Sequence, residues 1–336
     1  MSISPESQQI IGEAPAFIEM LEHVSRAAPL SKPVLVVGER GTGKELIASR
    51  LHFLSERWEQ RVVKVNCAAL TESILESELF GHEAGAFTGA ARTHMGHFER
   101  ADGGTLILDE LATISLRMQE KILRTIEYGE IQRVGGSETL QVDVRIVGST
   151  NADLQLLAAE GRFRKDLLDR LAFDVITVPP LRDRVEDIMP LAHAFAINMA
   201  SELKWSYFPG FSPRASSVLL KNLWPGNVRE LKNTIERTVY RSEDPEQPIK
   251  NIALDPFDSP FKIAPAVRSK TLAPPPKRPR LLPTDLQQRL VDLEIDLLEA
   301  ALERSRFNQR LAADLLGLSY HQFRGKLRKF GISSKP

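Results

Sequence analysis

The fold is decided by the stretch Val34-Leu35-Val36-Val37-Gly38-Glu39-Arg40-Gly41-Thr42-Gly43-Lys44. Four successive apolar residues predict a strand that is buried on both faces of a parallel sheet. The glycines that follow let backbone N–H groups close around a phosphate, and Lys44 begins a helix whose dipole favours the same anion. This order predicts a P-loop, with a plain turn before a helix as the alternative. Glu45 replaces the Ser or Thr that usually supplies a hydroxyl to Mg²⁺.

Composition limits the remaining possibilities. The 336 residues include 44 Lys and Arg and 44 Asp and Glu, so any affinity for nucleic acid must be local. The single cysteine, Cys67, excludes an intramolecular disulfide framework and indicates a reducing, cytoplasmic location. The sequence lacks a leader-like start and a run of about 18 apolar residues, so we expect neither a signal peptide nor membrane insertion.

Apolar runs alternate with helical patterns over the first half of the chain. The runs occupy residues 34–37, 62–65, 106–108, 144–147 and 175–178. This alternation predicts an α/β domain over residues 1–182, in which helices cover both faces of a parallel sheet. Residues 183–254 carry helical patterns without strands and predict a small helical subdomain.

The chain changes character again after residue 254. Closely spaced prolines predict an extended linker over residues 255–283. Residues 284–336 then predict an all-α domain, with helices over residues 286–304, 310–316 and 320–330. Ser319 is a suitable N-cap for the last helix, and Gln322 completes a capping box.

An apolar run over residues 106–108 ends in two carboxylates, Asp109 and Glu110. Ligands of α/β folds bind at the carboxyl edge of the sheet, where this strand delivers them. We expect Asp109 to hold Mg²⁺, largely through water, and Glu110 to orient and deprotonate the attacking water. A solvated acidic strand end is the alternative.

Polar residues end two other predicted strands. Thr150 and Asn151 follow one of them, where an amide and a hydroxyl could sense the γ-phosphate; a helix cap is the alternative. Asn66 follows another and could reach Glu110. Both positions lie at the edge of the sheet where the P-loop is expected.

Three arginines could complete the site from other elements. Arg164 and Arg170 are candidate arginine fingers, which act on the nucleotide of a neighbouring subunit. An intrahelical pair between Arg170 and Asp166 is an equally weighted alternative. Further along, Asn227 follows a proline–glycine turn and is expected to cap a helix whose Arg229 reaches the phosphates.

The stretch Glu78-Leu79-Phe80-Gly81-His82-Glu83-Ala84-Gly85-Ala86-Phe87-Thr88-Gly89-Ala90 points to one family. Together with the residues above, it is similar to the bacterial enhancer-binding proteins, AAA+ ATPases that activate RNA polymerase carrying sigma-54. The GAFTGA loop of that family is unaltered here, and a tight hairpin is the alternative. The resemblance implies that sigma-54 is contacted by Gly85, Ala86, Phe87, Thr88, Gly89 and Ala90. It covers residues 10 to about 241 and resumes at the C-terminus.

The resemblance also implies cofactors, roles and partners. The family uses ATP and Mg²⁺ and itself has Glu after the P-loop lysine, as Glu45 is here. The implied roles are Asn66 as the switch partner of Glu110, Thr150 and Asn151 as sensor I, Arg229 as sensor II, and Ile11 and Gly12 as further nucleotide-binding residues. We expect a homo-oligomer, a dimer at rest and a hexameric ring when active. Most members of the family carry an N-terminal sensing domain, whereas only nine residues precede Ile10 in this sequence. We therefore expect that another protein controls this one in trans.

The C-terminal end of the chain is locally basic. From residue 301 onward, eight Lys and Arg face two Asp and Glu. A basic patch on a helix-turn-helix predicts DNA binding, with a basic helical hairpin as the alternative, and it resembles the Fis-type domain of the family. The expected contacts are Arg310, Ser319, Tyr320, His321, Gln322, Arg324, Lys326 and Arg328. Leucines along residues 286–298 predict an amphipathic helix that pairs two chains.

These observations predict an ATPase that binds upstream enhancer DNA, assembles into a ring and remodels the closed complex of sigma-54 polymerase. Two other classes of protein remain as alternatives. A loader or unfoldase that merely binds DNA would not need the GAFTGA loop. An ATP-gated repressor without turnover would not need the pair Asp109-Glu110.

Overall fold

The structure, a computed structural model, describes residues 10–242, 244–257, 286–305 and 307–332. Contacts divide the chain into two units, Met1–Asp258 and Ser259–Pro336. Most of the linker predicted over residues 255–283 lies outside the described residues. Among the helices of the described ranges, none is both long enough and apolar enough to cross a membrane.

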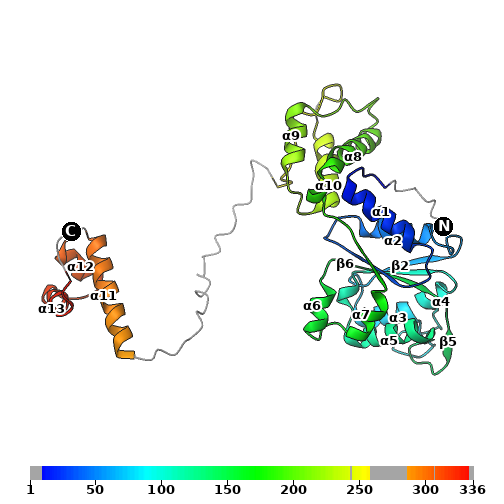
Figure 1. The fold of residues 1–336 in the computed structure, drawn as a ribbon, viewed down its shortest axis with the longest axis horizontal. Coiled ribbons are helices and arrows are strands. Elements are labelled where there is room, and N and C mark those ends of the chain that lie inside the picture. Colours follow the sequence, from blue (N-terminus) through cyan, green and yellow to red (C-terminus); the bar gives the residue numbers. More distant parts are fainter. Residues whose placement is uncertain (1–9, 243, 258–285, 306, 333–336) are drawn as a thin grey trace. The chain divides into compact units, whose positions relative to one another are not determined.

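A five-stranded parallel sheet in the order β2-β3-β6-β1-β7 forms the centre of the first unit (Figure 1). Its strands are β1 (Val34–Val37), β2 (Val62–Asn66), β3 (Thr105–Asp109), β6 (Arg145–Thr150) and β7 (Asp174–Thr177). They confirm the five predicted strands. An antiparallel hairpin of β4 (Glu130–Gln132) and β5 (Thr139–Gln141) is an addition that the sequence pattern did not predict.

Helices cover both faces of the sheet, because successive side chains of a strand point to opposite sides. Val34 and Val36 pack with the helices α1 (Pro15–Ala27) and α2 (Lys44–Phe53), whereas Leu35 packs on the other face. The helices of that other face are α3 (Glu72–Phe80), α4 (His97–Arg100), α5 (Leu116–Tyr128), α6 (Leu154–Ala159) and α7 (Lys165–Leu171). Figure 1 shows α3, α5 and α7 across the sheet from α1 and α2. Burial on both faces explains the unbroken apolar strands.

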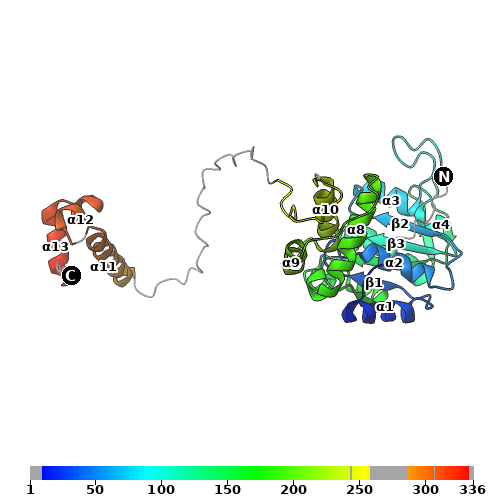
Figure 2. The ribbon, with the colours of Figure 1, turned by 90° about the horizontal axis from the view of Figure 1, so that it is seen from above.

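Three further helices form the predicted helical subdomain. They are α8 (Ile188–Glu202), α9 (Pro213–Lys221) and α10 (Asn227–Tyr240), preceded by the 3-10 turns Leu181–Asp183 and Val185–Asp187. Their core contains Trp224, Leu231 and Ile235, each fully buried, and Ile11 packs against it from the start of the chain. Figure 2 shows these helices grouped at one end of the sheet.

Over residues 286–305 and 307–332, the second unit forms three helices. It consists of α11 (Leu286–Arg304), α12 (Gln309–Leu315) and α13 (Tyr320–Phe330) around a core that includes Leu298, Leu302 and Phe323. The predicted capping box is present, since Ser319 Oγ accepts from the Gln322 backbone N–H and Gln322 Oε1 accepts from the Ser319 N–H. The cap begins α13 immediately after the turn, as a helix-turn-helix requires.

Candidate active site and partner-binding elements

The P-loop closes on its own lysine. Lys44 is the first residue of α2, and its Nζ donates to the carbonyl oxygens of Gly38 at 2.9 Å and Glu39 at 3.0 Å. Burial lowers the pKa of Lys44, and the negative charges of Glu110 and Asp109 oppose that shift. Gly41 has φ +76° and lies so close to Gly226 O that a Cβ would stand 2.3 Å away, so the loop requires glycine there.

The acidic pair lies at the carboxyl end of β3, as predicted. Ser149 Oγ on the neighbouring strand β6 donates to Asp109 Oδ1 at 2.5 Å and fixes that carboxylate. Glu110 adopts a left-handed conformation with φ +53°, and its carbonyl accepts from the backbone N–H and the hydroxyl of Thr113. A non-glycine residue in this region marks a turn that the surroundings impose.

The structure brings the other strand-end residues to the same edge but gives them local partners. Asn66 lies opposite Asp109 in the β2–β3 register, and its Oδ1 accepts from the Ala68 N–H at 2.9 Å. Thr150 is fully buried; its Oγ1 accepts from the Ala152 N–H, and its carbonyl accepts from the Gly38 N–H at 3.3 Å. Asn151 is exposed. The P-loop and the end of β6 are therefore joined directly.

The helical subdomain contacts the P-loop through a hydrogen-bonded cluster around Glu39. Arg182 donates to both carboxylate oxygens, at 2.7 and 2.9 Å, and Asn227 Nδ2 donates to Oε2 at 3.1 Å. The Arg182 and Asn227 hydrogen bonds lower the pKa of Glu39 to about 2. Arg229 lies over the same loop, because its N–H donates to Gly41 O at 3.2 Å.

The expectation that Asn227 caps a helix is wrong. The N-cap of α10 is Gly226, and Asn227 itself is fully buried in a left-handed conformation with φ +53°. Its side chain accepts from the Leu181 N–H at 2.8 Å and donates to Arg40 O at 3.0 Å as well as to Glu39. A left-handed backbone turns the amide away from its own helix and toward the P-loop.

The turn before α1 is also tied to this region. Asp187 Oδ1 accepts from the backbone N–H groups of Glu13 and Ala14, and a Cβ on Gly12 would lie 2.2 Å from the Phe17 ring. The guanidinium of Arg184 lies 4.6 Å from the centre of that ring, and it donates to Thr42 O at 2.9 Å. Ile11 therefore packs against the core of the helical subdomain, and Gly12 lies between Phe17 and Asp187.

The candidate fingers carry ion pairs that differ from the predicted one. Arg164 precedes α7 and donates to both oxygens of Asp166, at 3.0 and 2.8 Å. Arg170 donates from Nε to Glu127 on α5 at 2.9 Å, so the alternative that paired Arg170 with Asp166 is wrong. Glu127 comes from a helix packed against α7, which sequence spacing within α7 does not reveal. Both arginines lie on the surface of the unit.

The GAFTGA loop is a short hydrogen-bonded turn with an exposed aromatic tip. Gly85 N–H donates to Ala90 O at 2.8 Å, and Ala90 N–H donates to Phe87 O at 3.0 Å. The Phe87 side chain is 47% exposed, with its ring edge-on to His82 at 4.9 Å. The β4–β5 hairpin packs closely against this loop, since a Cβ on Gly135 would lie 2.6 Å from the Cβ of Ala86.

Arg133 fastens the base of this loop. Its guanidinium donates to Glu83 at 2.8 Å and to both oxygens of Glu99 at 2.9 and 2.7 Å, and the same arginine lowers the pKa of Glu83. Glu99 lies on α4, the helix that precedes β3. The loop base and the helix that precedes β3 are thus connected through one arginine, which no sequence motif singled out.

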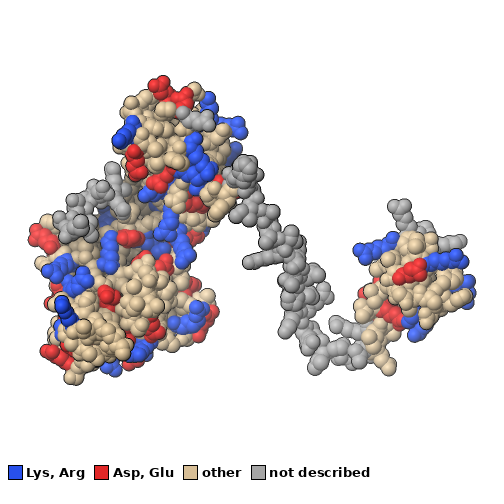
Figure 3. Space-filling model, turned by 180° about the vertical axis from the view of Figure 1, so that it is seen from behind, with Lys and Arg blue, Asp and Glu red and all other residues tan. Residues whose placement is uncertain are grey.

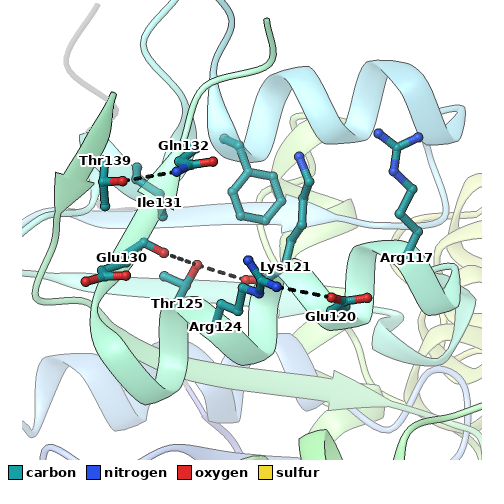
Figure 4. A pocket seen from close by; sticks show the side chains of 10 residues that line it. Arg117, Glu120, Lys121, Arg124, Thr125, Glu130, Ile131, Gln132 and Thr139 are labelled. Carbon is teal, nitrogen blue, oxygen red and sulfur yellow. Dashed lines mark hydrogen bonds and ion pairs between the residues drawn. The ribbon is translucent and has the colours of Figure 1, made fainter. Parts of the chain in front are cut away.

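A cavity of about 300 Å³ lies between α3, α5 and the β4–β5 hairpin (Figure 4). It is lined in part by Arg117, Lys121 and Arg124. Their charges are matched, since Arg117 and Lys121 pair with Glu76 and Arg124 pairs with Glu120. None of the predicted nucleotide residues lines this cavity. We assign the chemistry to the edge of the sheet instead.

The second unit presents most of its predicted DNA-contacting side chains to solvent. Arg310, His321, Arg324 and Arg328 are exposed, and the Arg310 guanidinium lies 5.9 Å from the Tyr320 ring centre. Lys326 differs from these, because it pairs with Glu294 on α11. Figure 3 shows Lys and Arg around the edges of this unit, with acidic side chains between them.

Comparisons with known proteins place this arrangement in a family. Residues 10–177 match the Sigma-54 interaction domain, residues 182–257 the AAA+ ATPase lid domain, and residues 289–330 the bacterial regulatory proteins of the Fis family. The chain belongs to the sigma-54-dependent transcriptional activators. It is an AAA+ ATPase that binds ATP, interacts with sigma-54 and binds DNA through its Fis-type domain.

Particular relatives narrow the comparison. The chain is 57% identical over 324 residues to the Psp operon transcriptional activator of Escherichia coli K12, covering 96% of this chain and 98% of the relative. It is 42% identical over 320 residues to the regulatory protein ZraR of Klebsiella oxytoca, covering 95% and 68%. Among solved structures, NtrX of Brucella abortus in complex with ATP is similar, with a TM-score of 0.68, 32% identity and coverage of 96% and 70%.

Proposed function

We propose that this protein uses ATP hydrolysis to move the Gly85–Ala90 loop against sigma-54, and so remodels the closed polymerase complex into an open one. The observation that carries the proposal is the connection through Arg133. It joins the base of the exposed loop to Glu99, ahead of the strand that delivers Asp109 and Glu110. A change at the acidic pair can therefore reach the loop through bonded, packed elements rather than through solvent.

Six of the predicted nucleotide-site residues have proposed roles in hydrolysis. Lys44 would exchange its two carbonyl partners for phosphate oxygens, and Arg229 would approach the same phosphates from the helical subdomain. Glu110 would orient and deprotonate the attacking water, with Asn66 as its switch partner. Thr150 and Asn151 would report the γ-phosphate, since the Thr150 carbonyl already contacts the P-loop at Gly38.

Mg²⁺ fits the donor set at the end of β3. Mg²⁺ keeps several waters and takes one or two protein carboxylates together with substrate phosphates. Asp109 supplies such a carboxylate, oriented by the short bond from Ser149. Glu45 lies one residue beyond Lys44 and pairs with Lys64 rather than turning toward Asp109. We therefore propose Asp109 as the principal protein ligand of the metal, which would neutralise charge on the phosphates.

The active form is proposed to be a hexameric ring built from dimers. A finger acts in a neighbour's site, and both Arg164 and Arg170 lie on the surface where a neighbour can reach them. For the dimer, the second unit exposes leucines along α11, with Leu290 57%, Leu293 55% and Leu297 50% exposed. Two chains joined there would present two α13 helices to two half-sites of enhancer DNA.

The similarity to the Psp operon activator supports phage-shock promoters as the targets. We propose that control comes from a separate protein, of the phage shock protein A type, acting in the cytoplasm. Trp58 is a candidate docking residue for it, because its side chain is 57% exposed. We also propose functional divisions at residues 182/183, 254/255 and 283/284.

Thr88→Ala tests the proposed coupling. We expect ATP hydrolysis within a few-fold of wild type, together with loss of sigma-54 capture in the presence of an aluminium fluoride analogue and loss of open-complex formation. Removal of one buried contact at a partner surface costs about 2 kcal/mol or more at a hot spot. Thr71→Ala is the matched control, because Thr71 is exposed and makes no side-chain cap bond. Normal promoter opening by Thr88→Ala would refute the coupling role.

A further inference from the structure

We infer that Gln119 is the positioning residue that holds the candidate finger segment, an inference that rests on the proposed ring and its trans-acting arginines. Gln119 lies on α5 with a fully buried side chain. Its Oε1 accepts from the Arg164 backbone N–H at 2.7 Å. Its Nε2 donates to Ile114 O at 3.0 Å and Arg162 O at 3.3 Å. No motif in the sequence drew attention to this glutamine.

The two sides that Gln119 joins have different functions. Ile114 directly follows the 3-10 turn Leu111–Thr113, which begins after Glu110, and the Glu110 carbonyl accepts from Thr113. On the other side, Arg164 is the N-cap residue of α7 and makes no side-chain cap bond. The Gln119 amide therefore connects the segment that follows the acidic pair, at Ile114, to the start of α7, the helix that carries Arg170.

An amide is required because the three contacts need a donor and an acceptor on one rigid plane. Glutamine offers both, whereas a carboxylate has no donor and an apolar side chain has neither. The neighbouring Glu120 is exposed, and its carboxylate approaches the Arg164 guanidinium at 3.9 Å. Consecutive residues of α5 thus hold one arginine, Gln119 at the backbone and Glu120 at the head group. Catalytic groups must be held closely, since a misplacement of about 1 Å can cost about 10²-fold in rate.

Mixed rings can separate a fault in the finger from a fault in the chain's own site. Gln119→Met removes donor and acceptor, and we expect turnover to fall about 10²-fold while ATP binding is retained. Adding a Lys44→Ala chain, which has intact fingers but a dead site, should restore turnover. Adding a chain with Arg164→Ala and Arg170→Ala should not. Gln155→Met, an exposed glutamine on α6, is the matched control and should behave as wild type.

Each other outcome counts against the inference. Rescue of Gln119→Met by the fingerless chain, without rescue by Lys44→Ala, would place the defect in its own site. Rescue by neither, while the fingerless and Lys44→Ala chains rescue each other, would mean a general loss of structure. If the fingerless chain and the Lys44→Ala chain do not rescue each other, Arg164 and Arg170 are not trans-acting fingers, and the inference about Gln119 is refuted with that proposal. Gln119→Glu keeps an acceptor for the Arg164 N–H but sets a buried carboxylate oxygen against the carbonyl oxygens of Ile114 and Arg162, so it should show the same rescue pattern and be no milder than Gln119→Met.

Discussion

Asn227→Ala should loosen the helical subdomain from the P-loop by a large amount. The substitution leaves the Leu181 N–H and the Arg40 carbonyl without their partner, at about 1–3 kcal/mol each when buried. Asn227 has φ +53°, and an alanine held in that conformation costs about 1–2 kcal/mol more. The total is about 3–8 kcal/mol, a large part of a typical domain stability of about 5–15 kcal/mol. The loss of the bond to Glu39 should also weaken nucleotide binding.

Two companion variants divide this effect into its parts. Asn227→Gly loses the same hydrogen bonds but not the backbone preference, so it should be more stable than Asn227→Ala by about 1–2 kcal/mol. Asn233→Ala removes an exposed asparagine from the same helix and serves as the control. The measurements are urea unfolding and fluorescent-nucleotide binding. A loss for Asn227→Ala within 1 kcal/mol of the control, with unchanged nucleotide affinity, would refute the assigned contacts.

Three other predictions concern separate parts of the chain. Lys44→Ala should abolish nucleotide binding, whereas Glu110→Ala should bind ATP and barely hydrolyse it; equal binding loss in equilibrium titrations would contradict the roles. Removing residues 284–336 should abolish enhancer binding in gel-shift assays but leave ATPase activity intact. Hydrogen bonds to the Glu39 carboxylate lower its pKa to about 2 from the ordinary value of 4.5. The contribution of these bonds to the free energy of unfolding should therefore be complete above pH 4.5 and vanish as the pH falls through 2. Glu39→Gln should lack this dependence in unfolding measurements.

The sequence predicts the sheet well because burial on both faces leaves a strong pattern. Val34–Val37 and Thr105–Asp109 are central strands in which nearly every side chain is buried, so apolar runs mark them clearly. The hairpin of β4 and β5 escapes such a search. Each of its strands has three residues, and the side chains of Glu130 and Gln132 are exposed. Its position depends on contacts with the loop at Ala86, which are distant in sequence.

The residues of the candidate site also fall into two groups, those that a local motif marks and those that connect distant segments. The positions of residues in a local motif, such as Lys44 at the start of α2 and Asp109 at the end of β3, can be predicted from spacing alone. Arg133 and Gln119 cannot, because each connects segments that lie far apart in the chain. A lone buried glutamine or a lone arginine in a short hairpin carries no periodic signal. Only the folded arrangement shows that each is surrounded by the partners that its hydrogen-bonding groups require.

One incorrect local prediction, the Asn227 cap, and one incorrect alternative, the Arg170–Asp166 pair, share one physical cause. From sequence spacing, Asn227 is assigned to cap a helix N-terminus and Arg170 is paired with an aspartate at i,i+4. A cap and an i,i+4 ion pair are both weak interactions at an exposed surface. The structure gives Asn227 the P-loop and gives Arg170 a glutamate from α5. A polar side chain that uses a distant partner in place of a nearby one makes the two segments move together. In this protein those segments are the lid with the P-loop and α7 with α5.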